Sequence, residues 1–457
     1  MFRNLENHLL DWKKRKNRKP LILRGARQVG KTYTVQKFAR DNYAHFLKIN
    51  LEKQNNLHSL FEKMDPKQII QELTALFQIP LMNENSLLFI DEIQAAPKAI
   101  RVLRYFYEDM PELHVISAGS LLDHTLNEKT YSMPVGRVEF AYMYPMSFYE
   151  FLIAIGENGL MQAIQNYKLN DAFSEVIHSR ILELLRTYYF IGGMPEAVKY
   201  YVDTRDLSGI EQIHSNLISS IQYDFSKFGT RKQQDSLIDV LNYAARNIGR
   251  KVVYSHVNKN ASSLTIKDAF LKLKMSRIIH LVRQTKSSSV PLTPHKRKDV
   301  FKPIFYDIGL LNHLAGIRLI DIQNLLTAHE GSLAEQFIFQ ELISNNEIWK
   351  EFKPFYWLRE AKNSNAEIDC IIQLQNTVFP VEIKAGKRGT LKSLHVYLAE
   401  KGKKTGIRFN ADVPSIGSGL KANLNLLDKK QITYSLISLP LYMAGILRSL
   451  KVDEAED

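Results

Sequence analysis

Hydrophobic and polar residues form two different patterns along the first third of this chain. In residues 1–150, short apolar runs alternate with stretches whose apolar residues recur every three or four positions. The apolar runs are PLILRG, AHFLKINL, SLLFIDEI and LHVISAGS. Each run predicts a buried strand, and strands that alternate with helices predict a parallel sheet in an α/β domain.

The middle of the chain has a mainly helical pattern. Residues 151–235 contain RILELLRTYYFI, whose apolar spacing predicts a helical lid subdomain. Residues 236–315 contain a predicted helix, a polar turn, a second helix and the strand IHLVRQ. This order is typical of a winged-helix module, and the polar segment TKSSSVPLTPHKRKD predicts an exposed loop or wing.

The last part of the chain predicts a second α/β unit. GSLAEQFIFQELI has the pattern of a helix, and NAEIDCIIQLQNTVFPVEIKAG predicts two strands joined by a polar turn. The tail KVDEAED predicts a disordered end. Four parts therefore follow from the pattern, namely residues 1–150, 151–235, 236–315 and 316–457.

Composition narrows the class of protein. A chain of 457 residues exceeds what one hydrophobic core usually supports, and its net charge of +13 favours a polyanionic partner. The single cysteine, Cys370, excludes an intrachain disulfide and fits a reducing compartment. The N-terminus lacks the apolar region of a signal peptide, and no apolar run reaches about 18 residues. We therefore expect a cytoplasmic protein with no membrane partner.

The octet GARQVGKT fits the pattern G-x-x-x-x-G-K-[ST] between a predicted strand and a predicted helix, which indicates a P-loop. Its glycines allow backbone N–H groups to face phosphate oxygens at a helix N-terminus. We expect Lys31 to reach the β- and γ-phosphates of ATP and Thr32 to bind Mg²⁺. The nucleotide-binding residues of the octet are Gly25, Ala26, Arg27, Gln28, Val29, Gly30, Lys31 and Thr32.

A second acidic motif follows the P-loop. SLLFIDEIQ places Asp91 and Glu92 at the end of an apolar run, as in a Walker B motif. Asp91 is expected to complete the Mg²⁺ site, and Glu92 to polarise the attacking water as a catalytic base. Ser117 or Ser120, at the end of the next predicted strand, is positioned to sense the γ-phosphate.

These motifs, with PVGRVEFAYMYPMSFYEFL, YFIGGMPEAV and AEIDCII...FPVEIKAG, resemble an AAA+-type ATPase of a prokaryotic family whose members add a C-terminal domain of unknown function. The resemblance implies that Arg137 is a catalytic arginine, often supplied by a neighbouring subunit in such ATPases, which favours a homo-oligomer. It also implies that Gly192, Gly193 and Pro195 set the lid geometry. A salt bridge for Arg137 and an ordinary turn for the glycines are the alternatives.

Acidic residues also gather in the predicted C-terminal unit. Strand alternation places Asp369 near the middle of one strand and Glu382 beside Lys384 on one face of the next, with Glu335 on the preceding helix. This order resembles the PD-(D/E)XK fold of restriction-endonuclease-like domains. The resemblance implies that Glu335, Asp369 and Glu382 bind Mg²⁺ or Mn²⁺ while the catalytic Lys384 orients water.

Alternatives remain open for this C-terminal site. Glu382 and Lys384 also fit an exposed cross-strand ion pair, and many proteins of this fold bind without cutting. Because the sequence has EID where the fold's name has Pro-Asp, Glu367 is the rival of Asp369 as a ligand.

Basic residues complete the functional hypothesis. The runs WKKRKNRK, HKRK and KGKK, with Lys267, Lys272 and Lys274 on the predicted recognition helix, favour contacts with a nucleic-acid backbone, DNA above RNA. The leading hypothesis is an ATP-hydrolysing protein that acts on DNA through a nuclease-like domain. A nucleotide-switched scaffold that does not cut is the second, and an AAA+ remodeller of proteins is the third.

Overall fold

The computed structural model describes residues 1–81, 83–127, 133–295, 300–317, 330–360, 366–386, 389–424 and 430–452. Lys296–Lys298 of the basic run HKRK and residues 453–457 of the predicted disordered tail lie outside these ranges. The chain divides into two compact units. Unit 1 comprises residues 1–145, 271–278 and 346–351, and unit 2 comprises residues 146–270, 279–345 and 352–457.

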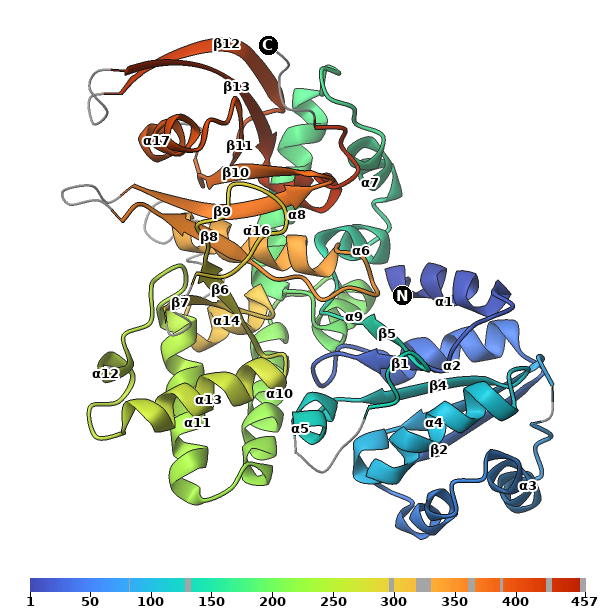
Figure 1. The fold of residues 1–457 in the computed structure, drawn as a ribbon. Coiled ribbons are helices and arrows are strands. Elements are labelled where there is room, and N and C mark those ends of the chain that lie inside the picture. The colour runs from blue at the N-terminus through green and yellow to red at the C-terminus, as the bar shows by residue number, and fades with distance from the viewer. Residues whose placement is uncertain are drawn as a thin grey trace. The chain divides into compact units, whose positions relative to one another are not determined.

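Unit 1 alternates strands and helices along its N-terminal 145 residues (Figure 1). Its elements are α1 (Asn4–Lys14), β1 (Leu21–Arg24), α2 (Lys31–Asn42), β2 (His45–Asn50), η1 (Asn55–Glu62), α3 (Pro66–Phe77), β3 (Ser86–Asp91), η2 (Ile93–Ala95), α4 (Pro97–Asp109), β4 (His114–Gly119), α5 (Leu122–Asn127) and β5 (Glu139–Tyr142). The strands β1 to β4 confirm the four apolar runs as strands. The short EFAY segment of β5 was not predicted, because four residues between turns carry little periodicity.

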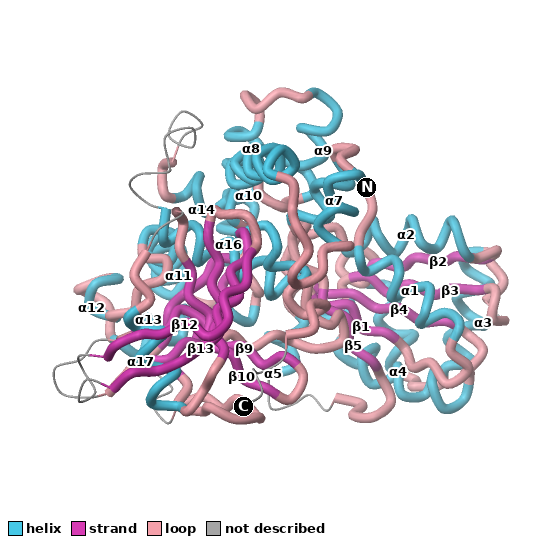
Figure 2. Tube along the Cα trace, turned by 90° about the horizontal axis from the view of Figure 1, so that it is seen from above, coloured by secondary structure: helices cyan, strands magenta, loops and turns pink. Residues whose placement is uncertain are grey.

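The described strands of unit 1 form a five-stranded sheet in the order β2-β3-β4-β1-β5, with every neighbouring pair parallel. The chain moves along the sheet in opposite directions after β1 and after β3, so right-handed crossovers place α2 and α4 on opposite faces. Figure 2 shows helices along both sides of these strands. The carboxyl ends of β1 and β3 therefore meet at one edge, where the P-loop and Asp91 lie.

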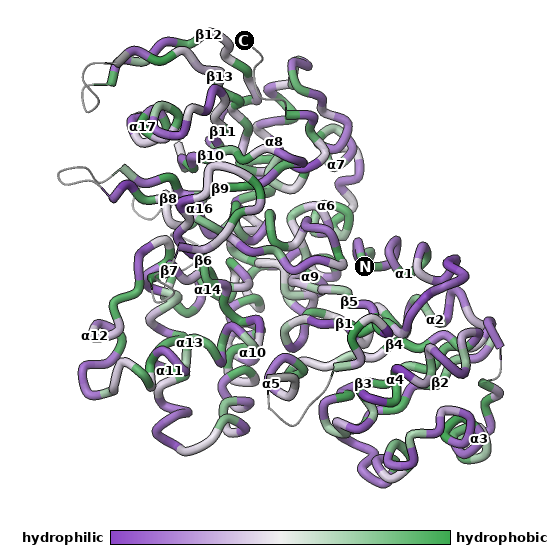
Figure 3. Tube along the Cα trace, in the orientation of Figure 1, coloured by the Kyte–Doolittle hydropathy of each residue, from purple (hydrophilic) through white to green (hydrophobic). Residues whose placement is uncertain are grey.

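The core of unit 1 explains why the strands read as continuous apolar runs. Ile22, Ile49 and Ile90 come from three strands and are fully buried, as strands covered on both faces require. The flanking helices carry both hydrophobic and hydrophilic residues, which Figure 3 shows in green and purple. Each of these helices therefore buries one side and exposes the other.

Unit 2 begins with a helical region, as predicted. Ser147 starts α6 with a capping box that Glu150 completes, and Pro195 occupies the first turn of α9, where its missing N–H costs nothing. The helices are α6 (Phe148–Ala154), α7 (Asn158–Gln165), α8 (Glu175–Ile191), α9 (Pro195–Thr204), α10 (Ile210–Asp224), η3 (Phe225–Lys227), α11 (Arg231–Arg246), α12 (Tyr254–Val257) and α13 (Ser263–Met275). The end of α13, from Leu271, groups with unit 1.

The described strands of unit 2 form one eight-stranded mixed sheet in the order β12-β13-β11-β10-β9-β8-β6-β7. Its elements are β6 (Ile279–Gln284), β7 (Phe301–Phe305), α14 (Ile308–Leu314), α16 (Glu330–Ser344), β8 (Phe355–Leu358), β9 (Glu367–Leu374), β10 (Thr377–Ile383), α17 (Lys392–Lys401), β11 (Thr405–Asn410), β12 (Ser415–Leu424), β13 (Lys430–Pro440) and η4 (Leu441–Ile446). The predicted hairpin is confirmed as antiparallel β9 and β10.

The strands expected in a separate winged-helix module belong to this same sheet. β6 pairs antiparallel with β7 and parallel with β8, so the hairpin that follows α13 extends the C-terminal sheet. The helix α16 packs against β7 and β10, and α17 packs against β9 to β13. Cys370 is buried in β9. None of the described helices is long and apolar enough to cross a membrane.

Candidate nucleotide site and C-terminal acidic cluster

The loop between β1 and α2 has the backbone shape of an anion-binding turn. Gly30, the residue before α2, has φ of +96°, and Gln28 has φ of +62°. A Cβ atom on Gly25 would lie 2.2 Å from the backbone oxygen of Met143, so only glycine fits there. A loop of this conformation at the N-terminus of α2 is suited to bind an anion through its backbone N–H groups.

Lys31 opens α2 and lies buried within the loop. Its Nζ donates hydrogen bonds to the backbone oxygens of Gly25 at 2.9 Å and Ala26 at 2.7 Å. Burial lowers the pKa of Lys31 to about 8, although the carboxylates of Glu92 and Asp91 oppose this shift. An ammonium held by two carbonyls is ready to exchange them for the stronger attraction of a phosphate oxygen.

Thr32 and Asp91 are brought together, as the sequence predicts for a Mg²⁺ site. The Thr32 hydroxyl donates to Asp91 Oδ2 at 3.0 Å, and Lys48 Nζ from β2 lies 3.4 Å from the same oxygen. Asp91 is 4% exposed. A hydroxyl and a carboxylate are the hard oxygen donors that Mg²⁺ prefers, so these residues fit the ion.

Glu92 is held by a residue that the sequence analysis missed. Its backbone is left-handed, with φ of +50°, and its Oε2 accepts a hydrogen bond from Gln94 Nε2 at 2.6 Å. A Cβ atom on Gly119, at the end of β4, would lie 2.1 Å from Gln94 Oε1. Gln94 therefore fills the space between the candidate catalytic base and β4. The glutamine in DEIQ was the available signal, but its spacing alone did not indicate a role.

Arg277 is a second missed residue, and it lies in unit 1 although it follows α13. Its guanidinium lies 2.8 Å from Asp123 Oδ2 and 3.3 Å from Glu351 Oε1, and it stacks over the Tyr142 ring at 4.7 Å. Asp123 also pairs with Arg24, the residue before the P-loop, at 3.2 Å. The distance along the chain left no sequence signal for this network.

The positive charge of Arg277 reaches the nucleotide site. It contributes, after burial and together with Arg27, to the lowered pKa of Lys31. Its buried Nε has no hydrogen-bond partner among the described residues. Arg277 therefore adds a fixed cation whose donors are not all used.

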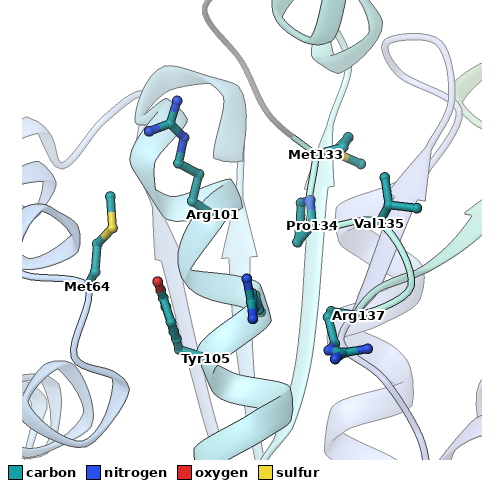
Figure 4. Close-up of a pocket in the computed structure, with 8 residues that line it drawn as sticks. Met64, Arg101, Tyr105, Met133, Pro134, Val135 and Arg137 are labelled. Carbon is teal, nitrogen blue, oxygen red and sulfur yellow. The ribbon is translucent and has the colours of Figure 1, made fainter.

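Arg137 lies at the surface, paired with Glu108, whose Oε1 accepts from its Nε at 2.7 Å. This pair raises the pKa of Arg137. The side chains of Arg101, Tyr105 and Arg137 line a pocket of about 640 Å³ (Figure 4). Arg137 therefore forms a salt bridge, which was the alternative interpretation. A catalytic role for Arg137 at a neighbouring subunit stays a prediction.

Ser117 is less available than expected. Its buried hydroxyl lies 3.5 Å from the backbone oxygen of Leu21 in β1. A hydroxyl directed at a neighbouring strand is occupied within the sheet. Ser120 lies just beyond β4 and is half-buried, so of the two serines it is the more accessible to a nucleotide.

The glycines of GGMPEAV serve a tight junction inside unit 2. The Gly193 N–H donates to Asp307 Oδ2 at 2.6 Å, and Asp307 Oδ1 accepts from Leu310 N–H at 3.0 Å. Gly192 has φ of +72°, and a Cβ atom there would lie 2.3 Å from Asp307 Oδ1. Burial raises the pKa of Asp307 to about 6, against three backbone hydrogen bonds. These contacts fit an ordinary structural turn, which was the alternative interpretation of Gly192 and Gly193. A role in setting the lid geometry stays a prediction.

In unit 2, β9 and β10 place Asp369 beside Glu382 and Lys384, as strand alternation predicts. Asp369 Oδ2 accepts from the Ile383 N–H at 2.8 Å, and Lys384 Nζ lies 2.5 Å from Glu382 Oε1. Burial raises the pKa of Glu382 to about 7, with a further contribution from Asp369. Glu382 is 5% exposed, so the alternative of an exposed cross-strand pair does not fit this geometry.

Glu335 and Glu367 are occupied by a lysine that the sequence analysis did not consider. Lys302 Nζ, from β7, lies 3.2 Å from Glu335 Oε1 and 2.6 Å from Glu367 Oε1. Across the described residues, no three carboxylate, imidazole or thiolate side chains are placed to share one metal ion. The predicted triad of Glu335, Asp369 and Glu382 is therefore not assembled as a metal site in this geometry. Lys302 divides the carboxylates, which explains the difference.

The basic runs do not all lie free on the surface. In WKKRKNRK, Trp12 is fully buried and its Nε1 donates to the Lys19 backbone oxygen at 2.9 Å, while Lys13 Nζ donates to the Asn42 oxygen. In KGKK, Lys401 Nζ donates to the Lys286 oxygen at 3.3 Å. These runs are partly structural, and α13 carries Lys267, Lys272 and Lys274.

The parallel sheet, the P-loop backbone and the paired Thr32 and Asp91 define unit 1 as a P-loop NTPase domain. Comparison with family models narrows this class, because residues 17–152 match a family described as an AAA domain. Residues 182–321 match the domain of unknown function DUF8612, and residues 330–422 match the domain of unknown function DUF4143. None of these three descriptions names a nuclease.

Solved structures show similarity at low identity. The Walker-type ATPase of Pyrococcus abyssi is 15% identical, with 68% of this chain and 95% of that chain covered and a TM-score of 0.43. The ORC2 protein of Aeropyrum pernix is 12% identical, with coverage of 70% and 92% and a TM-score of 0.31. DnaA of Aquifex aeolicus is 11% identical, with coverage of 60% and 88% and a TM-score of 0.27. A search of curated proteins finds no match.

Proposed function

We propose that unit 1 binds ATP with Mg²⁺ and hydrolyses it. One observation carries this proposal: the buried Lys31, the Thr32–Asp91 pair and the Gln94-held Glu92 all lie where the P-loop meets the ends of β1 and β3. A P-loop without the acidic residues would support binding alone. The carboxylate of Glu92 supplies the base that hydrolysis requires.

Each residue has a distinct task in this reaction. The P-loop N–H groups hold the phosphates, and Lys31 gives up its two carbonyl contacts to donate to the β- and γ-phosphate oxygens. Thr32 and Asp91 would hold Mg²⁺, which neutralises charge on the phosphates when it is bound. Glu92 orients the attacking water and accepts its proton, while Gln94 keeps the carboxylate in place.

Nucleotide turnover by the full-length chain tests this proposal. We expect Lys31→Ala to lose ATP hydrolysis because the γ-phosphate loses its buried cation, and Lys37→Ala, on the same helix, to retain it. Lys37 serves as the control because its ammonium pairs with Glu6 at 2.6 Å instead of contacting P-loop carbonyls. Unchanged hydrolysis by folded Lys31→Ala would refute the assignment.

We further propose that the protein acts on nucleic acid, with DNA favoured, and that ATP binding controls this action. The net charge of +13 supports this partner, because a basic protein is attracted to the phosphate backbone. For the C-terminal domain we propose binding without cleavage, because the described carboxylates are shared with Lys302. The protein would then be a nucleotide-switched scaffold that does not cut, which is the second hypothesis from the sequence.

Two assays on the same preparation separate these possibilities. In a gel-shift titration, affinity for duplex DNA should fall steeply as salt rises, because phosphate contacts release counterions; a flat response would contradict the DNA proposal. Plasmid incubated with Mg²⁺ or Mn²⁺, with and without ATP, should stay intact. Cleavage by wild type that Lys384→Ala abolishes would instead establish the nuclease role.

A further inference from the structure

A buried lysine lies among the carboxylates of the C-terminal acidic cluster, which comprises Glu335, Glu367, Asp369 and Glu382. Lys302 comes from β7 and is 2% exposed. Its Nζ contacts one oxygen each of Glu335 and Glu367 and lies 5.2 Å from the centre of the Tyr356 ring. An ammonium group is costly to bury without such partners, so these contacts fix its position.

The charge state of Lys302 follows from these neighbours. Burial by itself would lower the pKa of the Lys302 ammonium, but the carboxylates of Glu335 and Glu367 outweigh burial and raise it. The ion pairs of Lys302 Nζ with Glu335 Oε1 and Glu367 Oε1, at 3.2 and 2.6 Å, hold the side chain in the cluster as an ammonium. The cluster holds a permanent cation supplied by the chain itself.

Both carboxylate oxygens of Glu367 are taken by lysines. Oε1 contacts Lys302, and Oε2 lies 2.8 Å from Lys251 Nζ. The second oxygen of Glu335 faces the backbone of Gly249, where a Cβ atom would lie 2.3 Å from it. Gly249 has φ of +69°, so glycine is favoured there by conformation as well as by space. Little is left of these two side chains for another cation.

The other two acids of the cluster, Asp369 and Glu382, are also partly occupied. Asp369 Oδ2 accepts the Ile383 N–H, and Glu382 Oε1 contacts Lys384. Glu382 Oε2 is buried and has no hydrogen-bond partner among the described residues. Mg²⁺ and Mn²⁺ require several oxygen ligands, and lysine ammonium groups already hold one oxygen of Glu335, one of Glu382 and both of Glu367.

We infer that Lys302 is the resident cation of the acidic cluster, and that its ammonium takes the place a divalent cation would need. The wild-type domain accordingly takes no Mg²⁺ or Mn²⁺ at this cluster. Removal of the ammonium frees one oxygen of Glu335 and one of Glu367 beside Asp369, which creates a site for a hard divalent cation. This inference is independent of ATP hydrolysis, because it concerns unit 2 alone.

Mn²⁺ binding to the full-length chain without nucleotide tests the inference, with free Mn²⁺ followed by electron paramagnetic resonance. Every protein carries Asp91→Asn, which removes the expected P-loop contribution. We expect no bound Mn²⁺ with Lys302 intact, and one bound ion per chain in Lys302→Met. Glu335→Gln added to Lys302→Met should abolish the gain. Lys302→Arg keeps the positive charge and should also bind none.

Three outcomes would overturn the inference. The first is Mn²⁺ bound with Lys302 intact at a site that Asp369→Asn removes, a measurement that does not depend on the folding of a Lys302 variant. The second is a folded Lys302→Met that gains no ion, with folding judged by circular dichroism. The third is an equal gain in Lys302→Arg. In support, Mn²⁺ should raise the melting temperature of Lys302→Met and not that of Lys302→Arg, because binding to the folded state stabilises it.

Discussion

At the residue scale, the nucleotide site depends on one side chain that holds another. Glu92 has a left-handed backbone, so its position is set by the turn after β3, and Gln94 then fixes its carboxylate through the 2.6 Å hydrogen bond. Gly119 leaves room for the Gln94 amide. The carboxylate of Glu92, the proposed base, is therefore already oriented without a nucleotide, which would lower the cost of reaching the reactive geometry.

Gln94→Ala should lower kcat for ATP hydrolysis by about 10- to 100-fold while the nucleotide Kd stays unchanged. A hydrogen bond to a charged group contributes about 1.5–3 kcal/mol, and about 1.4 kcal/mol corresponds to a tenfold change in rate. Gln68→Ala is the matched control, because Gln68 Nε2 donates to Glu72 on the surface of α3 at 3.0 Å. Steady-state turnover and fluorescent-nucleotide titration measure the two quantities. A wild-type kcat in Gln94→Ala would contradict the positioning role.

The sequence predicted the parts of the site that are close in the chain. Lys31 and Thr32 belong to one octet, and Asp91 and Glu92 end one apolar run, so spacing alone indicated them. Arg277 and Lys302 act through contacts with residues remote in sequence, with Asp123 in one case and Glu367 in the other. Local sequence patterns do not indicate contacts between residues that are distant in the chain.

At the element scale, unit 2 relies on a junction where backbone segments touch. The Met146 N–H donates to the Gly193 oxygen at 2.6 Å, and a Cβ atom on Gly193 would lie 2.1 Å from the Met146 oxygen. Asp307 closes the same junction by accepting the Gly193 N–H. These backbone contacts join the end of α8, the start of α9 and the N-terminus of α14. They require glycine because there is no space for a side chain between the segments.

Gly193→Ala should destabilise the protein by about 1–3 kcal/mol, since the added methyl group forces two backbone segments apart. Gly159→Ala is the control. It lies in α7 with nothing within 4 Å of the added Cβ, and alanine favours helix, so a gain of up to about 1 kcal/mol is expected. Chemical denaturation gives both values. Equal stability of the two variants would show that the junction tolerates a side chain.

Strand and helix types followed from periodicity, whereas their grouping into sheets did not. The apolar runs of β1 to β4 and the β9–β10 hairpin have local signatures, and all are present. The addition of β6 and β7 to the C-terminal sheet depends on the pairing of β6 with β8, and the chain between β7 and β8 includes α14 and α16. Pairing between strands distant in the chain is decided by packing, which periodicity does not encode.

At the scale of the whole molecule, unit 2 buries several acids whose pKa values are raised. Burial is the largest cause for Asp307, Glu335, Glu341 and Glu382, with values of about 6, 7, 8 and 7. In the unfolded chain, aspartate and glutamate side chains have a pKa of about 4. Between these values the folded state binds more protons than the unfolded state, so the free energy of unfolding falls as pH rises from about 5 to about 8.

Glu341→Gln should flatten this dependence. Glu341 is fully buried in α16 and accepts the Phe148 N–H at 2.9 Å, which the glutamine oxygen still accepts without a buried charge. The melting temperature of the variant should exceed that of wild type at pH 8 and differ less at pH 5.5. Glu347→Gln, an exposed position, should leave the curve unchanged. A wild-type melting temperature that rises from pH 5.5 to 8 would contradict the sign of the effect.

Glu92→Gln separates ATP binding from ATP hydrolysis at the P-loop of unit 1. The variant keeps the shape of the side chain and removes the base, so it should bind ATP with Mg²⁺ within about threefold of the wild-type Kd while kcat falls about 100-fold or more. Both quantities come from one preparation, by nucleotide titration and phosphate release. Hydrolysis by Glu92→Gln at the wild-type rate would show that Glu92 is not the base and would refute the proposed site.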